Sequence, residues 1–513
     1  MPSIQDDEID LLVVGFGLAG AACAIFAHDA GMRVLIVEKM PRPGGISITA
    51  GGGVLYATDA DGAFACLQAA CGGRTPDGVL RSFVDGLCRI PTWLSSMTER
   101  SALALELRTS QVEQIPYDLP GRDSLGTLLV KPLDNFSPFP WASGLRGGAR
   151  LFQILWHNVM SRSIPVRYGT AAQRLDVGSD RRVVGAWVRS ADQEMHVSAS
   201  AGVVLACGGF EWDEDLKRQY FQGMPILPVA GPGNTGDGLR MAQAAGASLW
   251  HMWHYHGGYG FKVPGLDYAI RHTFYGSRYS KGRDPEFHVV PWIAVDKDGR
   301  RFMNELHPYP NDTNARPLEI FDPDRLEYPR IPCYLVFDDA GIRRGPIGHP
   351  IATVESRSSY TWSLDNQAEV ESGLIVRGDS LGELVARLNH EVGAHITEAV
   401  LDDTIERWNN ACEVGTDAQF LRPSPTMMPI KGPPYYALPA WPIVSNTQGG
   451  PAHNADRQVL DAFGAPIPGL YSAGELGSLF GHLYLISGNI SECLVSGWLV
   501  ARHLRQAAVS AAA

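Results

Sequence analysis

Residues 9–38, IDLLVVGFGLAGAACAIFAHDAGMRVLIVE, decide the fold of the N-terminal part of the chain. The apolar run at the start and RVLIV near the end each predict a buried parallel strand, and the small residues between them predict a helix. The intervening GFGLAG turn has GxGxxG spacing, which permits a tight turn, lets the backbone approach a pyrophosphate and leads into a helix N-terminus that supplies amide donors. Glu38 ends the second strand, where a carboxylate can accept hydrogen bonds from ribose hydroxyls. This order of elements predicts a dinucleotide-binding α/β fold.

A second set of glycine-rich segments favours FAD over NAD as the dinucleotide. PGGIS at 43–47 and GGG at 51–53 closely follow the ribose carboxylate, which suits a long flavin dinucleotide. Far downstream, GLYSAGE at 469–475 predicts a strand that runs into a glycine turn, and GNI at 488–490 opens a helix. The N-terminus of that helix can face the negatively polarised pyrimidine end of a flavin. Both ends of the sequence are therefore expected to complete one nucleotide fold, with an insertion between them.

The composition of the 513 residues argues against several other classes of protein. The formal net charge of −12 disfavours nucleic acid or an anionic membrane surface as a partner, because either would need a basic face. We expect no secretory leader, because the start, Met1 to Asp10, is acidic and lacks a basic region followed by an apolar one. We expect no membrane span, because no apolar run approaches roughly 18 residues. None of the eight cysteines lies in a CxxC pair, so no zinc ribbon, iron–sulfur ligand set or attached haem is indicated. We expect reduced thiols and a cytoplasmic location.

Further motifs make the chain similar to the fumarate reductase/succinate dehydrogenase flavoprotein superfamily. The matching segments occur in family order: GFGLAG, IVEK, PGGIS, ACGGF, GNTGDGLRMA, DGRRFMNE, TQGG and LYSAGE. The resemblance implies an α/β fold with a Rossmann-like, three-layer FAD-binding domain on a parallel sheet, built from residues 1–255 and 438–513. It also implies an inserted α+β capping and catalytic domain, residues 256–437, that closes over the flavin ring.

The cofactor implied is FAD, held noncovalently. Covalent attachment in succinate dehydrogenases uses a histidine in the loop before the flavin glycines, and the equivalent loop at 45–52, GISITAGG, has no histidine. No metal is expected, because WHMWHYH at 250–256 gives no tetrahedral ligand set with carboxylate support. The residues expected to bind FAD are Gly15, Gly17, Leu18, Ala19, Gly20, Glu38, Lys39, Gly44, Gly45, Ser47, Gly51, Gly52, Ala172, Ala206, Gly208, Asn234, Asp237, Gly474, Glu475, Asn489 and Ile490.

The charged groups with which fumarate-type enzymes bind their substrate are missing from this chain. The resemblance places an arginine proton donor four residues after RFxNE, a histidine before TxGG and an arginine before the loop that opens the last helix. Here these positions are Tyr309, Asn446 and the stretch Leu483–Leu485. Burying two carboxylates without cationic partners would be very costly. We therefore expect a small, neutral, hydrophobic substrate.

A set of tyrosines is similar instead to the 3-ketosteroid dehydrogenase branch of the superfamily. That branch has one catalytic tyrosine just past RRFxNE, a second in a GHTY-like segment and a third in an aromatic, proline-rich segment. The corresponding residues are Tyr309 in ELHPY, Tyr484 in GHLY and, as a looser match, Tyr117 in PYDLPG. Two segments depart from the branch: its PGPGGTIG loop is LISGNI at 485–490, and its TKGG is TQGG at 447–450.

These residue types suit the removal of a proton and a hydride from carbons next to a ketone, with the hydride passing to flavin N5. The Tyr484 hydroxyl and the amide of Gly488, or of Ser487, are candidate donors to the carbonyl oxygen. Tyr309 is the candidate base; because an ordinary tyrosine has a pKa of about 10, the phenol of Tyr117 is a candidate to share its proton. A steroid-like ketone and an external electron acceptor are the expected reactants, and in reverse the same groups would reduce an enone.

Other interpretations of these residues stay open. Tyr117 is more often structural than catalytic in such a setting, and Tyr309 or Tyr484 can be a surface or packing tyrosine. Asn304 and Glu305 of RFMNE are expected to anchor the cap locally. For the whole chain, the missing arginine and histidine disfavour a flavin enone reductase of the urocanate or fumarate kind. The retained phenols disfavour a non-catalytic flavoprotein subunit.

Overall fold

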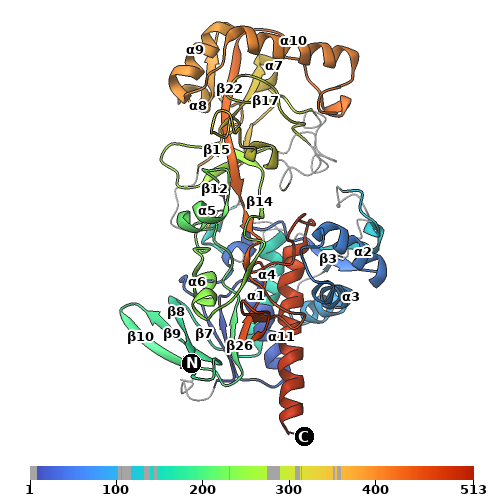
Figure 1. The fold of residues 1–513 in the computed structure, drawn as a ribbon, viewed down its shortest axis with the longest axis vertical. Helices are drawn as coiled ribbons and strands as arrows, with labels where there is room; N and C mark the ends of the chain where they lie inside the picture. Colours follow the sequence, from blue (N-terminus) through green and yellow to red (C-terminus); the bar gives the residue numbers. More distant parts are fainter. Residues whose placement is uncertain are drawn as a thin grey trace.

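The computed structural model is elongated, with a six-stranded sheet towards one end and an eight-stranded sheet towards the other (Figure 1). It describes residues 9–101, 105–106, 117–131, 139–143, 147–229, 231–273, 289–306, 312, 315–349, 353–354 and 360–512.

The six-stranded sheet contains both ends of the described chain. Its order is β25-β26-β11-β1-β2-β7. The strands are β1 (Leu11–Val14), β2 (Val34–Val37), β7 (Val166–Arg167), β11 (Gly202–Leu205), β25 (Gln458–Leu460) and β26 (Pro466–Ser472). β25 is antiparallel to β26, and the other neighbours are parallel. Because β26 pairs with β11, the expectation that both ends of the sequence complete one sheet is confirmed.

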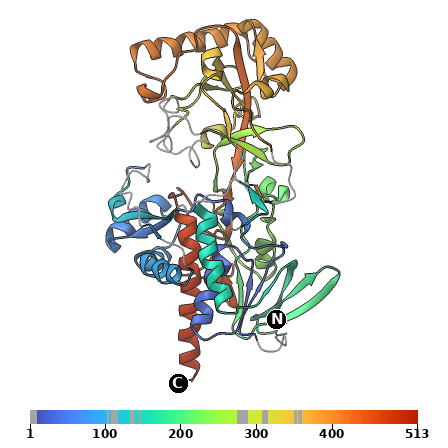
Figure 2. The same cartoon turned by 180° about the vertical axis from the view of Figure 1, so that it is seen from behind.

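Layers on both faces of this sheet explain why its inner strands are apolar throughout. One face is covered by α1 (Leu18–Asp29), α4 (Gly147–Ser161) and α11 (Gly488–Ala512), seen from behind in Figure 2. The other face is covered by the antiparallel sheet of β8 (Thr170–Val177), β9 (Val183–Ser190) and β10 (Gln193–Ser198). Along β1, Leu11 and Val13 pack with the helices, whereas Leu12 and Val14 pack with β9. The predicted three-layer fold is confirmed.

Helix α1 approaches its neighbours closely because it is built from small residues. A Cβ added to Gly20 would lie 1.9 Å from the carbonyl oxygen of Gly15, in the turn after β1. A Cβ added to Gly497 of α11 would lie 2.6 Å from main-chain atoms of Ala22 and Cys23 in α1. Glycine is therefore required at both positions by space rather than by backbone conformation.

A smaller lobe lies beside the helical face and was not predicted (Figure 1). It contains α2 (Ala60–Cys71), α3 (Asp77–Glu99) and an antiparallel sheet of β3 (Val54–Ala57), β5 (Leu125–Val130) and β4 (Leu105–Glu106). Helix α3 packs directly on α11, since a Cβ at Gly86 would lie 2.4 Å from the Val495 side chain.

The inserted segment forms a second, mixed sheet with helices on its outer side (Figure 1). Its main path is β17 (Ile293–Val295), β18 (Cys333–Asp338), β22 (Tyr435–Val444), β15 (Tyr259–Lys262), β16 (Ala269–His272) and β19 (Gly348–His349). The helices are α7 (Asp339–Ile342), α8 (Gln367–Glu371), α9 (Leu381–Val392) and α10 (Glu398–Val414). β22 pairs along its length with β21 (Val376–Gly378), β18 and β12 (Leu227–Pro228), so it ties this sheet to the earlier part of the chain. The domain division at residues 256 and 437 stays a prediction.

Short elements join the two sheets. Helices α5 (Glu214–Tyr220) and α6 (Asp237–Ala244) follow β11. Two small ribbons pair β13 (Leu249–Trp250) with β24 (Gly450–Pro451), and β14 (Tyr255–His256) with β23 (Asn446–Thr447). None of the described helices combines the length and apolar character needed to cross a bilayer.

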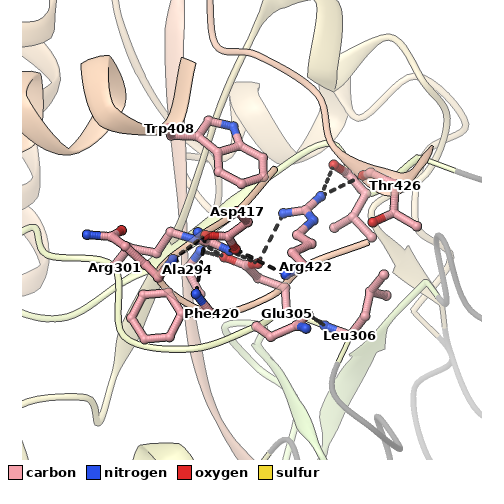
Figure 3. A network of polar contacts seen from close by, with 12 residues as sticks. Ala294, Arg301, Glu305, Leu306, Trp408, Asp417, Phe420, Arg422 and Thr426 are labelled. Carbon is pink, nitrogen blue, oxygen red and sulfur yellow. Dashed lines mark hydrogen bonds and ion pairs between the residues drawn. The ribbon is translucent and has the colours of Figure 1, made fainter. Parts of the chain in front are cut away.

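A buried ionic network holds the inserted segment together (Figure 3). The fully buried Glu305 carboxylate lies 2.9 Å from Arg301 and 3.1 Å from Arg422, and Arg301 also pairs with Asp417 at 2.8 Å. Burial opposes ionisation of Glu305, but the two arginines outweigh it and hold the pKa of that carboxyl below its usual range. Asn304 donates to the carbonyl of Leu421. The local anchoring expected of Asn304 and Glu305 is confirmed.

Replacing Gly20 with alanine should destabilise the fold, because the new Cβ would meet the Gly15 carbonyl oxygen at 1.9 Å. Overpacking of this kind costs about 1–3 kcal/mol, occasionally more. The matched control is Gly78→Ala in α3, where the exposed glycine has no atom within 4 Å of the added Cβ. That change should stabilise by roughly 0.4–1 kcal/mol. Thermal unfolding of the two variants should therefore shift in opposite directions; equal shifts would contradict the packing argument.

Candidate functional site

A cavity opens at the carboxyl ends of β1, β2 and β11, where parallel α/β sheets bind their ligands. The predicted cofactor residues that line it are Gly15, Gly17, Leu18, Ala19, Glu38, Lys39, Gly45, Ser47, Ala172, Ala206, Gly208, Asn234, Asp237 and Glu475. The other predicted cofactor residues lie outside this lining, namely Gly20, Gly44, Gly51, Gly52, Gly474, Asn489 and Ile490. The structure thus brings together residues from both ends of the sequence, as the motifs suggested.

The three glycines of the first turn have different physical tasks. Gly15 has a φ of +103°, and a Cβ there would lie 2.5 Å from the Ala206 carbonyl oxygen. The turn therefore requires glycine at this position. Gly20 is required by the close packing of α1 against the turn after β1. Around Gly17 the nearest atom to an added Cβ is Ser47 Oγ at 3.3 Å, and the Ser47 hydroxyl accepts from the Leu18 amide at 3.1 Å. Gly17 therefore leaves space on the cavity side, where a phosphate group can reach the backbone.

The glycines of the second loop, at 44–52, also differ in how closely other atoms surround them. A Cβ at Gly44 would meet the Ile48 side chain at 2.5 Å, and one at Gly52 would meet the Gly147 main chain at 2.0 Å. Gly45 and Gly51 have no atom within 4 Å of an added Cβ. Two of these glycines are thus required by packing, and two border open space.

The acidic end of β2 is already fixed by the backbone. Glu38 Oε2 accepts from the Phe16 amide at 2.7 Å, and Glu38 Oε1 accepts from the Met40 amide at 2.8 Å. Burial raises the pKa of the Glu38 carboxyl, and these amides counteract it. The neighbouring Lys39 lies 2.7 Å from the Asp237 carboxylate, which holds the loop before α6 against this edge of the cavity.

Glu475, which lines the cavity, forms a pair of buried carboxyl groups with Glu211. Glu475 Oε1 accepts from the Gly209 amide at 2.8 Å and from Asn234 Nδ2 at 2.7 Å, while Glu211 Oε1 accepts from the Thr447 amide at 2.7 Å. Burial and the adjacent Glu211 raise the pKa of Glu475 well above its usual range. The neighbouring Glu211 therefore disfavours ionisation of Glu475. Glu475 was predicted and Glu211 was missed, although it directly follows the CGGF turn.

A second polar cluster surrounds Tyr484, just before α11. The buried Tyr484 ring packs on the imidazole of His256 with centroids 4.2 Å apart. Asn446 Oδ1 accepts from His256 Nδ1 at 3.0 Å, and Asn446 Nδ2 donates to Asn489 Oδ1 at 3.3 Å. Burial, and then the charge of Arg271, lower the pKa of His256 to about 4. At neutral pH this chain of hydrogen-bonding groups is uncharged.

Asp312 joins Tyr484 to Tyr117 and was missed from the sequence. Its Oδ2 atom accepts from the Tyr117 hydroxyl and from the Tyr484 amide, each at 3.0 Å. Its Oδ1 atom accepts from His254 Nε2 at 3.1 Å, and Arg316 lies 3.4 Å away. The ELHPYPND segment shows no local pattern that would have marked its aspartate; the spacing of only three residues from the predicted catalytic tyrosine was the available signal.

Tyr309 and Gly488 are the remaining predicted catalytic residues. Tyr309 lies outside the described residues. The Gly488 amide donates to the Leu485 carbonyl at 2.8 Å, so in this structure its hydrogen bond is made within the chain. A Cβ at Gly488 would lie 2.3 Å from the Phe480 ring, which accounts for glycine at this position.

The histidines of the segment at 250–256 bind separate partners. His251 lies 2.8 Å from the Ser478 carbonyl oxygen, His254 contacts Asp312, and His256 contacts Asn446. Within the described parts of the chain no group of three or more His, Cys, Asp or Glu side chains could hold a metal ion.

The family model of an FAD binding domain matches residues 10–490, which is most of the chain. The chain belongs to this FAD-binding family.

Three relatives that the chain resembles have different named activities. A 3-oxosteroid 1-dehydrogenase of Mycolicibacterium smegmatis is 27% identical, with 96% of each chain covered. A urocanate reductase of Eggerthella lenta is 28% identical over 96% of this chain and 73% of the relative. A solved 3-ketosteroid delta1-dehydrogenase from Sterolibacterium denitrificans, in complex with 1,4-androstadiene-3,17-dione, has a TM-score of 0.80 at 23% identity and covers 98% of this chain and 100% of its own. The protein is an FAD-dependent oxidoreductase of the fumarate reductase/3-ketosteroid dehydrogenase family.

The residues of the cavity fit FAD. Gly17 leaves room for a phosphate at the N-terminus of α1, Glu38 ends β2 beside it, and Gly45 borders open space. The bound cofactor supplies the site that accepts or donates a hydride.

Replacing Gly17 with valine should prevent FAD loading, because the side chain would occupy the phosphate side of the turn. Within the protein the nearest atom to the added Cβ is Ser47 Oγ at 3.3 Å, a hydroxyl on a side chain that can shift, so the apoprotein should fold. Absorbance at 450 nm per chain, after reconstitution with excess FAD, should fall to near background while circular dichroism is unchanged. The control is Gly432→Val, where no atom lies within 4 Å of the added Cβ. Full flavin content in Gly17→Val would show that the phosphates bind elsewhere.

Proposed function

We propose that the chain desaturates the carbon–carbon bond next to a ketone in a flat, neutral, polycyclic substrate such as a 3-ketosteroid, or reduces the corresponding enone in reverse. FAD is held noncovalently, and an external acceptor takes the electrons. The observation that carries the proposal is the uncharged hydrogen-bonding chain beside Tyr484: His256, Asn446 and Asn489.

A dicarboxylate would find poor compensation in this chain of groups. Asn446 stands where fumarate-type members have a histidine, and the pKa of His256 is lowered to about 4 by burial and then by Arg271. The Arg271 guanidinium itself donates to Ser445 Oγ at 2.7 Å. A neutral ketone avoids the desolvation cost of two carboxylates and still uses hydrogen-bond donors.

The relatives support a ketone substrate and also a second candidate. One relative of 27% identity is a 3-oxosteroid dehydrogenase, and the fold matches that of a 3-ketosteroid dehydrogenase bound to a steroid. A urocanate reductase is equally similar, so a flavin enone or fumarate-type reductase acting on another small unsaturated substrate is the second candidate.

In the proposed reaction the chain supplies two kinds of group. The Tyr484 hydroxyl donates to the ketone oxygen and so stabilises the charge that develops when the α-proton leaves. The Gly488 amide adds a second donor by exchanging the Leu485 carbonyl for the substrate oxygen. Tyr309 removes the proton, and Tyr117 lies beside Tyr484 through their shared partner Asp312.

An anaerobic titration tests the substrate class. The purified yellow holoenzyme should be bleached by 4-androstene-3,17-dione or a saturated 3-ketosteroid without any partner protein. The reduced form should not be reoxidised quickly by fumarate or urocanate, because the cationic groups that bind carboxylates are replaced by Asn446, Tyr309 and Leu483–Leu485. Rapid turnover of either carboxylate, with no bleaching by any ketone, would favour the second candidate.

Two tyrosine variants test the roles within the site. Tyr309→Phe should leave ketone binding intact and slow flavin reduction by about 10²–10⁴-fold, as for a positioned base. Tyr484→Phe should weaken ketone binding and slow reduction by up to about 10²–10³-fold, as for an oxyanion donor. Rapid-mixing absorbance at 450 nm separates the binding and reduction steps, and Tyr435→Phe in β22 is the control. Reduction of Tyr309→Phe at the parent rate with every accepted ketone would exclude the mechanism.

A further inference from the structure

Asp312 is a buried carboxylate on the inserted segment that is contacted by three distant parts of the chain and by the nearby Arg316. Its side chain has no exposed surface. The donors are the Tyr117 hydroxyl, the His254 ring, the Arg316 guanidinium and the Tyr484 amide. Two of these four belong to tyrosines of the proposed reaction. Asp312 lies in none of the family motifs and does not line the cofactor cavity.

The carboxylate is ionised at neutral pH. Burial opposes ionisation, but the hydrogen bond and charge of His254, the charge of Arg316 and the Tyr484 amide outweigh it and hold the pKa of Asp312 at about 2. A buried negative charge is costly unless it is paired and hydrogen-bonded in this way. His254 is itself held from the other side, since its Nδ1 lies 2.5 Å from the Phe480 carbonyl oxygen. Asp312 is therefore a fixed charge rather than a group that exchanges protons.

The bond to Asp312 fixes what the Tyr117 hydroxyl can do. A phenol has one proton, and here that proton is donated to the carboxylate at 3.0 Å. Toward any further polar group the Tyr117 oxygen can then act only as an acceptor. The same oxygen of Asp312 holds the Tyr484 amide, so one atom sets the orientation of a phenol and the main chain of the proposed oxyanion donor.

We propose that Asp312 is a positioning residue of this enzyme, which orients the Tyr117 hydroxyl and the Tyr484 main chain for the reaction at the flavin. The proposal rests on the proposed function for its kinetic consequence. Its negative charge also disfavours ionisation of the nearby phenols. The Glu305–Arg422 network makes its buried contacts within the inserted segment (Figure 3), whereas Asp312 links that segment to Tyr117 and Tyr484 outside it.

The decisive variant is Asp312→Asn, which keeps the shape and removes the charge. It should load FAD and slow ketone-dependent flavin reduction by about 10–100-fold, as for a misplaced reacting group. In addition, the limb of the pH profile of the reduction rate that reports phenol ionisation should move to lower pH, because the phenols ionise more readily without the neighbouring charge. The control Asp324→Asn removes the same charge from an exposed position in the same segment and should match the parent.

A second measurement needs no substrate. In Asp312→Ala holoenzyme the Tyr484 amide loses its acceptor, so hydrogen–deuterium exchange in the peptide that contains Tyr484 should become faster than in the parent. If flavin reduction in Asp312→Asn is slower but the pH limb does not move, Asp312 is a purely structural residue and the proposal fails. If the reduction rate and the exchange of both variants match the parent, the proposal is also overturned. If no ketone reduces the parent flavin, the proposed function fails, and the exchange measurement alone decides whether Asp312 holds Tyr484.

Discussion

The close packing of α1 against the six-stranded sheet and against α11 is the constraint on which the rest of the structure depends. Gly20 lets the helix approach the turn after β1, and Gly497 lets the last helix approach Ala22. Because α1 starts at the cofactor turn and α11 starts beside Tyr484, this contact sets the distance between the cofactor cavity and the tyrosine cluster. Larger residues would separate the two helices and so displace both sites.

Four buried carboxyl groups are compensated in four different ways, and the difference indicates what each one does. Glu305 is paired with two arginines and holds the insertion together. Glu38 is held by backbone amides at the edge of the cavity. Glu475 accepts from Gly209 and Asn234, and burial and the neighbouring Glu211 raise its pKa. Asp312 alone among these four accepts from a tyrosine hydroxyl of the proposed reaction. Burial by itself therefore does not identify the residue that matters for chemistry; the nature of its donors does.

The cofactor turn could be predicted from the sequence because its signals are local. The GFGLAG turn, the flanking apolar runs and Glu38 lie within 30 consecutive residues, and the structure has them in the expected strand–helix–strand order. The tyrosine cluster depends on contacts between distant segments. His256 meets Asn446 only because β14 pairs with β23, and Tyr117 meets Asp312 across 195 residues. No periodicity or motif encodes such pairings, so the resemblance supplied Tyr117 and Tyr484 while Asp312 and Glu211 were missed. The lobe of α2 and α3 was missed because it forms no motif of its own.

The position of β26 and α11 has a consequence for how the protein is made. The first strands and α1 leave the ribosome early, whereas the strand that pairs with β11 and the helix that covers α1 come from the last tenth of the chain. Until they arrive, the apolar side of α1 and one edge of the central sheet are exposed. Exposed apolar surface and unpaired strand edges are prone to aggregation, so the earlier part of the chain carries that risk until β26 and α11 have been made. The cavity is lined by Glu475 as well as Gly17, so its wall is complete only once the segment that contains β26 and Glu475 has been made.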